Sequence, residues 1–468
     1  MKKTKLLSGS VIAVLSHIPV MSHAATCTAL GTGFVCGALD SAPISSDANN
    51  ISVTVDAGAS IVSDDEDDTP ISLGGDNVAI TNNGTITQSD DNNGGNAITT
   101  SGNGVTIVNS GAIQSGDRAI ETDGGSNVSV TNEAGATIEA RRQAVRAGTD
   151  TPGASVVNDG TIISTEGRAL QLRSFGASVI NRGDLIGAEE VVEARGDFFL
   201  ENHGTIRLID PSITDEDGVQ LSGGEVQNFG FISGSDDGVD LDEGLIVNHA
   251  GATILSTAPD TNDNGGIDID EIYDDDVSPE RAPTGVTIVN DGTIEGPNAI
   301  NTDVAAMSSL TLTNRGVLRG RGGTAINLAP DMGDSILNLE GTSEVFGDVL
   351  FGSGDDTVSV TNISSGFLST GFFDGNLGFD TAAFASTLAD FQEFTVSGTQ
   401  VDLSFLSNGD LISATFLNFE SWFVGGTTYT TAAFEEAVNA VPLPASLPLL
   451  LAGFGGLGLM RRNSKKRA

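Results

Sequence analysis

The chain has 468 residues, a formal charge of −42 and 38% hydrophobic residues. The hydrophobic share is too high for a fully disordered acidic chain, and the length is too great for a disulfide-stabilised mini-protein. The acidic balance excludes a nucleic-acid-binding protein, because such a protein needs a basic face. The 60 glycines follow no three-residue period, so a collagen-like chain is excluded as well.

Residues 1–24 have the pattern of a secretory signal peptide. Three lysines precede an apolar run, and a small-residue cleavage site ends at Ala24. A retained membrane anchor is the alternative, but Ser16 and His17 interrupt the apolar run. We therefore expect recognition by the secretion machinery and cleavage by signal peptidase.

Two cysteines, Cys27 and Cys36, follow the expected cleavage site directly. In an exported chain two cysteines most simply form one disulfide, which here would close a short loop. Metal binding by the pair is disfavoured, because no nearby histidine completes a ligand set. The sequence thus predicts an N-terminal cap with a disulfide over residues 25–50.

An Asn-x-Gly-x-Ile element recurs through residues 51–345, with one extra residue in some copies. Its spacing is about 24 residues, and a period of this size indicates a solenoid. The repeated asparagines are Asn82, Asn109, Asn132, Asn158, Asn181, Asn202, Asn228, Asn248, Asn290 and Asn314.

Aliphatic and polar residues alternate on both sides of each repeated asparagine, which is the period of a β-strand. A third short strand begins at a small–branched pair such as Ala97-Ile98. The pattern predicts an all-β, right-handed parallel β-helix of about twelve coils with three short strands per coil. We expect Asn and Gly at the turn because both tolerate left-handed backbone, and we expect the stacked asparagines to form an internal amide ladder.

These coils resemble the passenger stalks of bacterial autotransporters and related filamentous surface adhesins. The phrases at 105–111 (VTIVNSG in one-letter code, from Val105 to Gly111) and at 286–292 are typical of them. The resemblance implies a rod at the bacterial surface. Self-transport through an outer-membrane pore is not implied, because the C-terminal sequence is of another kind.

Residues 346–435 are rich in phenylalanine that alternates with polar residues. We expect further β-structure here that caps the open end of the solenoid, since a repeat protein needs a closed end for solubility.

Residues 436–468 contain a short proline motif, an apolar stretch and a basic end, in that order. The apolar stretch at 443–460 is long enough for a single transmembrane helix, and the basic end belongs on its cytoplasmic side. The order closely resembles the PEP-type C-terminal sorting signals of exosortase-type enzymes, in the variant Val441, Pro442, Leu443, Pro444 and Ala445. The resemblance implies transient anchoring in the inner membrane with the bulk periplasmic, then transfer to the cell surface or outside the cell. A plain C-terminal anchor is the alternative.

Carboxylates are the best candidates for a functional site. Asp240 and Asp242 follow one coil's third strand, and Asp268 and Asp270 hold the matching positions one coil later. If Val239 points inward, all four carboxylates point outward, with Asp240 over Asp268 and Asp242 over Asp270. Such an oxygen-rich square would suit Ca²⁺, whereas a solvated acidic face is the alternative.

The sequence offers few residues for nucleophilic or acid–base catalysis by histidine. Only His203 and His249 remain after removal of the signal peptide, and both are expected as exposed turn residues.

Nine arginines between 118 and 207 are expected to pair with nearby glutamates, or else to offer a patch for acidic polysaccharide. We expect no enzyme, but a structural or adhesin-like surface protein. The alternative is a Ca²⁺-dependent protein that binds acidic polysaccharide, or a polysaccharide lyase.

Overall fold

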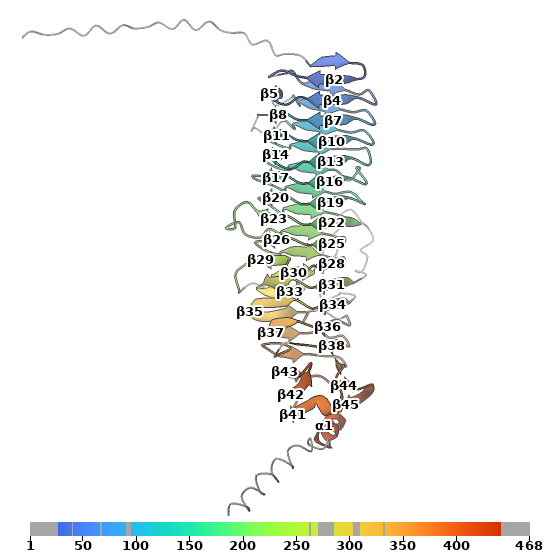
Figure 1. Cartoon of the computed structure of the whole chain (residues 1–468), viewed down its shortest axis with the longest axis vertical. Coiled ribbons are helices and arrows are strands. Elements are labelled where there is room, and N and C mark those ends of the chain that lie inside the picture. The colour runs from blue at the N-terminus through green and yellow to red at the C-terminus, as the bar shows by residue number, and fades with distance from the viewer. Residues whose placement is uncertain are drawn as a thin grey trace, which may run out of the picture.

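The structure is a computed structural model that describes residues 27–39, 41–65, 68–89, 95–261, 264–269, 285–302, 309–330, 333–364 and 366–440. It is an all-β parallel solenoid of the right-handed type with about twelve turns, as the repeat predicts. Figure 1 shows the coils stacked in a single column, with the N-terminal strands at one end and helix α1 (Thr431–Ala440) at the other. The predicted signal peptide, 1–24, lies outside the described residues.

Each regular coil has three strands, as predicted, and each strand pairs with its equivalent in the next coil. From β7 to β34 the first strand carries the repeated asparagine at its end, whereas β2 ends at Cys36 and β4 at Val55. These strands are β2 (Gly33–Cys36), β4 (Ser52–Val55), β7 (Ala79–Asn82), β10 (Thr106–Asn109), β13 (Ser129–Asn132), β16 (Ser155–Asn158), β19 (Ser178–Asn181), β22 (Phe198–Asn202), β25 (Gly224–Asn228), β28 (Gly244–Asn248), β31 (Val286–Asn290) and β34 (Leu310–Asn314).

The second strand follows the asparagine turn. Its copies are β5 (Ser60–Ser63), β8 (Thr85–Gln88), β11 (Ala112–Ser115), β14 (Thr137–Ala140), β17 (Thr161–Ser164), β20 (Asp184–Gly187), β23 (Thr205–Leu208), β26 (Phe231–Gly234), β29 (Thr253–Ser256) and β32 (Thr293–Gly296).

The third strand begins at or next to the small–branched pair in most coils, whereas β3 and β6 begin after a proline. Its copies are β3 (Ile44–Ser46), β6 (Ile71–Leu73), β9 (Ile98–Thr100), β12 (Ile120–Thr122), β15 (Val145–Ala147), β18 (Leu170–Leu172), β21 (Val192–Ala194), β24 (Val219–Leu221), β27 (Val239–Leu241), β30 (Gly265–Ile269) and β33 (Asn298–Thr302).

The core consists of aliphatic columns that run along the axis. Ile107 pairs with Val130 and Val130 pairs with Val156 in the parallel register, and each of the three side chains is at most 2% exposed. Stacking at about 4.8 Å per coil brings like side chains into direct contact, and their burial is the main source of stability. The predicted buried column is confirmed.

An asparagine ladder runs beside this core. Every repeated asparagine is fully buried, and from Asn82 to Asn290 each donates through Nδ2 to Oδ1 of the asparagine in the next coil at 2.8–2.9 Å. At the N-terminal end of the ladder the residue paired with Asn82 in the previous coil is Val55. At the C-terminal end Asn314 donates to the Ser343 hydroxyl at 2.6 Å. The predicted internal ladder is thus confirmed, from Asn82 to Asn314.

The turn glycines serve a different purpose from the one we expected. The ladder asparagines do not adopt positive φ, and neither does Gly183 in the turn after Asn181. A Cβ on Gly183 would lie 1.9 Å from the carbonyl oxygen of Gly160 in the previous coil. Glycine is required because neighbouring turns approach this closely, and left-handed backbone occurs instead in the longer copies, as at Gly135 with φ +82°.

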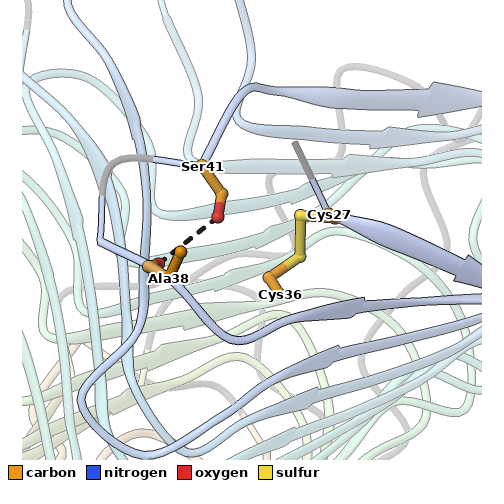
Figure 2. Close-up of a disulfide and its surroundings, with 4 residues drawn as sticks. All are labelled: Cys27, Cys36, Ala38 and Ser41. Atoms are coloured by element: carbon orange, nitrogen blue, oxygen red, sulfur yellow. Dashed lines mark hydrogen bonds between the residues drawn. A yellow bond between two sulfur atoms is a disulfide. The ribbon is translucent and has the colours of Figure 1, made fainter. Parts of the chain in front are cut away.

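The N-terminal end is closed by a β-hairpin. Strand β1 (Thr28–Leu30) pairs antiparallel with β2, whose other edge begins the parallel stack. Figure 2 shows the disulfide between Cys27 and Cys36 next to this hairpin, and the Ser41 hydroxyl that donates to the Ala38 carbonyl oxygen at 3.3 Å. An antiparallel strand at the end of a parallel stack leaves no matching edge for another coil.

The parallel pairing extends on both sides of the predicted 51–345 region, from β2 through to β44. The later first strands are β36 (Ile336–Glu340), β38 (Thr357–Thr361), β40 (Thr381–Phe384) and β44 (Ser421–Val424). From the coil that begins with β34 onward, the second and third strands merge. β35 (Val317–Asn327) follows β34, β37 (Glu344–Leu350) follows β36, and only the short β39 (Phe373–Asp374) follows β38.

The C-terminal end has an aromatic core. An antiparallel meander of β41 (Phe391–Ser397), β42 (Gln400–Ser407) and β43 (Asp410–Leu417) packs there with β45 (Thr427–Thr430), the short 3₁₀ helix Leu388–Asp390 and α1. Trp422 is fully buried against Phe434 of α1 and donates through Nε1 to the Thr431 hydroxyl at 3.1 Å. None of the described helices is long and apolar enough to cross a membrane, and the predicted span 443–460 lies outside the described residues.

Candidate functional site

The predicted stacking of carboxylates is present in part. Asp240 in β27 pairs with Asp268 in β30, between aliphatic residues that point into the core. Asp242 follows β27, and Asp270 lies outside the described residues. The alternation with the buried Val239 and Ile267 agrees with carboxylates that point outward. This face is nevertheless largely covered, because Asp242 is only 7% exposed and Asp268 only 8% exposed, while Asp240 is half-buried.

The outward-pointing residues of successive third strands form a column along the rod. Elsewhere in this column each acidic residue lies next to neutral or basic residues. Glu121 pairs with Arg146 in the next coil and binds it at 2.6 Å, and Gln171 donates to Glu193 at 2.7 Å. Gln220 reaches Asp240 at 3.5 Å. Along the described column from Thr99 to Asn327, Asp240 and Asp268 are the one place where two acids are direct neighbours.

A tighter group of carboxylates lies at the neighbouring corner, in the turns before β24 and β27. Asp217, Asp236 and Asp237 each offer an oxygen, and these oxygens lie within 4.8 Å of one another. Asp217 and Asp237 are 7% and 6% exposed, and Asp236 is half-buried. We call these three residues the acid cluster.

Backbone amides hold the acid cluster in place. The Asp237 N–H donates to Asp217 Oδ1 at 3.0 Å, and the Gly265 N–H donates to Asp237 Oδ1 at 2.7 Å. The Asn264 side chain donates to Asp236 Oδ1. Each side chain therefore accepts a hydrogen bond from the coil that follows, which fixes the carboxylates while leaving them close together.

Burial raises the pKa of Asp217 and of Asp237 well above the ordinary aspartate value, and negative neighbours raise it further. Asp268 is one of those neighbours for both groups. Burial, together with Glu190 and Glu189, also raises the pKa of Glu216 to about 7. Either protons or a cation would relieve the repulsion between carboxylates held this close, and several oxygen ligands at close range suit a hard divalent cation such as Ca²⁺.

Arginines between 118 and 207 pair with acids, as expected. Arg168 binds Glu189, Glu190 and Glu193, and Arg141 binds Glu166 at 2.9 Å. Most of this basic charge is therefore neutralised within the rod.

His203 and His249 lie at turns, as expected, but they stack on a shared partner. The ring of Phe229 lies between them, with centroids 4.5 Å and 3.7 Å away and interplanar angles of 8°. The three residues each follow a ladder asparagine in consecutive coils, so the repeat itself aligns the rings.

Sequence reasoning missed all three residues of the acid cluster, Asp217, Asp236 and Asp237, as site residues. Asp217 precedes Gly218-Val219 just as Asp237 precedes Gly238-Val239, so aligning the small–branched pairs would have found the first of them. Asp236 gives no such signal, because its side chain reaches the cluster only through the shape of the turn. Comparison with protein-family models, curated proteins and solved structures finds no match for this chain.

Proposed function

We propose that the protein is an exported structural or adhesin-like rod of the bacterial cell surface or extracellular matrix. The observation that carries the proposal is the near-uniform stack of coils, closed at one end by a disulfide-linked hairpin and at the other by an aromatic cap. A stack of this kind presents a long, regular side to its surroundings, which suits display or adhesion.

The route to the surface rests on the two terminal segments of the sequence. The secretion machinery and signal peptidase would process 1–24, and 443–460 would hold the chain in the inner membrane with the bulk periplasmic. An exosortase-type enzyme would then act at the motif Val441–Ala445 and release the rod to the surface or the exterior. Of this region the structure describes only residues up to 440.

Intact-mass analysis of the exported protein tests the route. We expect a mass that lacks residues 1–24 and the C-terminal tail, and a Pro442→Ala, Pro444→Ala double variant that retains the tail and stays in the membrane fraction. The Asn463→Ala variant, a change outside the motif, is the control and should be processed normally. A full-length chain in the cytoplasm would refute the proposal.

The acid cluster favours a second candidate function, Ca²⁺-dependent binding or lyase cleavage of acidic polysaccharide. Its supporting observation is the three carboxylates within 4.8 Å beside the stacked pair Asp240 and Asp268. Ca²⁺ bound here would bridge the protein to uronate groups of a polymer.

Calorimetric titration with Ca²⁺ tests this candidate. We expect millimolar or tighter binding with release of protons, since the pKa values of Asp217 and Asp237 are raised, and loss of most of the heat in Asp237→Asn. The matched control is Asp150→Asn, at an exposed turn position. No heat with the parent protein would refute the Ca²⁺ site, and no unsaturated product from uronate polymers would refute the lyase.

A further inference from the structure

A cavity of about 400 Å³ opens where the three-strand coil gives way to merged strands. It is lined by Arg319 and Arg321 of β35, by Phe346 and Asp348 of β37, and by Thr370, with glycines between them. The register between β35 and β37 shifts after Arg319, so the surface here departs from the regular coil. Bulges of this kind often re-aim side chains next to binding sites, and the volume falls within the range of ligand pockets.

Arg319 differs from the arginines on either side of it. Arg315 binds Glu340 at 2.9 Å, and Arg321 binds Asp260 at 2.8 Å and two backbone carbonyl oxygens of the same loop. Among the described residues the Arg319 side chain makes no hydrogen bond, and its ion pair with Glu295 is long, with Nε 3.6 Å from Oε2. Its side chain is 42% exposed and its guanidinium carbon lies 4.1 Å from the centre of the Phe346 ring. Stacking on the ring holds the guanidinium flat and leaves its N–H edge open to a planar anion.

The remaining cavity groups favour a hydroxylated acid over a simple anion. Asp348 accepts the Phe372 N–H through Oδ1 at 3.2 Å, and the half-buried carboxylate would repel an anion that brings no donor. The Thr370 hydroxyl accepts the Gly347 N–H at 2.9 Å and keeps its own proton to donate. A sugar acid satisfies all three groups, since its carboxylate accepts from Arg319 while its hydroxyls donate to Asp348 and accept from Thr370.

We propose that this cavity binds one carboxylated sugar unit of an acidic polysaccharide, with Arg319 as the carboxylate anchor. The site lies three or more coils beyond the acid cluster and does not depend on it. This binding site goes beyond the proposed surface role. It rests on that role only for the place where the protein meets the polymer, which is the cell surface or the matrix. Binding in solution needs no export, so failure of one leaves the other standing.

The test is calorimetry of the purified full chain with a uronate tetramer and with its carboxyl-reduced, neutral counterpart, in EDTA and 0.15 M salt to screen the net negative charge. We expect binding of the charged tetramer, at least tenfold weaker binding of the neutral one, and at least a tenfold loss in Arg319→Gln that Arg319→Lys restores only in part. Arg315→Gln, outside the cavity, should bind as the parent does. Circular dichroism and melting temperature show that each variant is folded.

Asp348→Ala separates a sugar site from a general anion site. It should weaken the uronate tetramer and strengthen acetate, because alanine removes both the negative charge and the acceptor for a sugar hydroxyl. Equal affinity for the charged and neutral tetramers, no effect of Arg319→Gln, or no binding by the parent protein would each overturn the proposal.

Discussion

The asparagine ladder makes a quantitative prediction at its centre. The Asn181 side chain accepts from Asn158 Nδ2 at 2.8 Å and donates to Asn202 Oδ1 at 2.8 Å. Asn181→Ala removes both bonds, together with the donations of Asn181 Nδ2 to the carbonyl oxygens of Gly183 at 3.2 Å and Thr205 at 3.3 Å. It leaves the fully buried amides of Asn158 and Asn202 each short of a partner. Each such loss costs about 1–3 kcal/mol, so we expect a destabilisation of about 2–6 kcal/mol.

An exposed asparagine three coils earlier in the rod is the control. Asn103 also donates across coils, to Asp76 Oδ1 at 2.8 Å, but both side chains are exposed. Asn103 Oδ1 also accepts from the Ser126 N–H at 3.1 Å and from the Ser126 hydroxyl at 2.9 Å, both at the surface. Water replaces these lost bonds in Asn103→Ala, so we expect a cost below about 1 kcal/mol. A solenoid can unfold in steps, so urea unfolding by circular dichroism should be combined with hydrogen exchange of the amides around residue 181.

The charged variant sharpens the test. Asn181→Asp keeps the acceptor for Asn158 but places a carboxylate opposite the Asn202 oxygen, where no donor remains. We expect a larger loss than for alanine at neutral pH, which shrinks as pH falls, since a protonated carboxyl donates again. The reasoning fails if Asn181→Ala is no more destabilising than Asn103→Ala.

Two further substitutions follow from the fold. Gly183→Ala should destabilise the protein by about 2 kcal/mol or more, because the new Cβ would lie 1.9 Å from a carbonyl oxygen. Gly366→Ala, where a Cβ meets open space, should leave the melting temperature unchanged, and equal effects of the two variants would contradict the close-approach explanation. Cys36→Ser opens a loop with a sequence separation of 9 residues and should cost about 2–3 kcal/mol at the N-terminal end. We expect faster hydrogen exchange in β1 and β2 and no change in the ladder coils, and exchange in β1 and β2 as slow as in the parent protein would contradict this.

Much of the fold follows from periodicity alone. The residues that precede each asparagine by two positions are aliphatic throughout, and one period places each on its neighbour, as Ile107 and Val130 show. The coil geometry repeats, so a local pattern fixes distant contacts. The merger of strands at β35 could not be predicted this way, because it depends on a register shift that no repeat spacing records.

The sites were less predictable than the fold for the same reason. Asp240 over Asp268 follows from the repeat, but the burial of Asp268 depends on the side chains that cover the outer face. Asp236 reaches the acid cluster from a turn whose shape varies between coils. The stacking of Arg319 on Phe346 joins two strands outside the regular repeat.

Protons and Ca²⁺ are two ways to stabilise the acid cluster, and pH separates them. The pKa values of Asp217 and Asp237 are raised in the folded state, so protonation stabilises the fold fully below about pH 4, the ordinary aspartate value, and this contribution is lost as pH rises through the raised values. In EDTA the melting temperature should therefore rise on going from pH 8 to pH 5, and less so in an Asp217→Asn, Asp237→Asn variant. Ca²⁺ should raise it at pH 8 and lose effect at pH 5, because protons compete for the same oxygens. A parent protein and variant with the same pH dependence would mean that repulsion over the whole acidic chain, and not this cluster, sets the response.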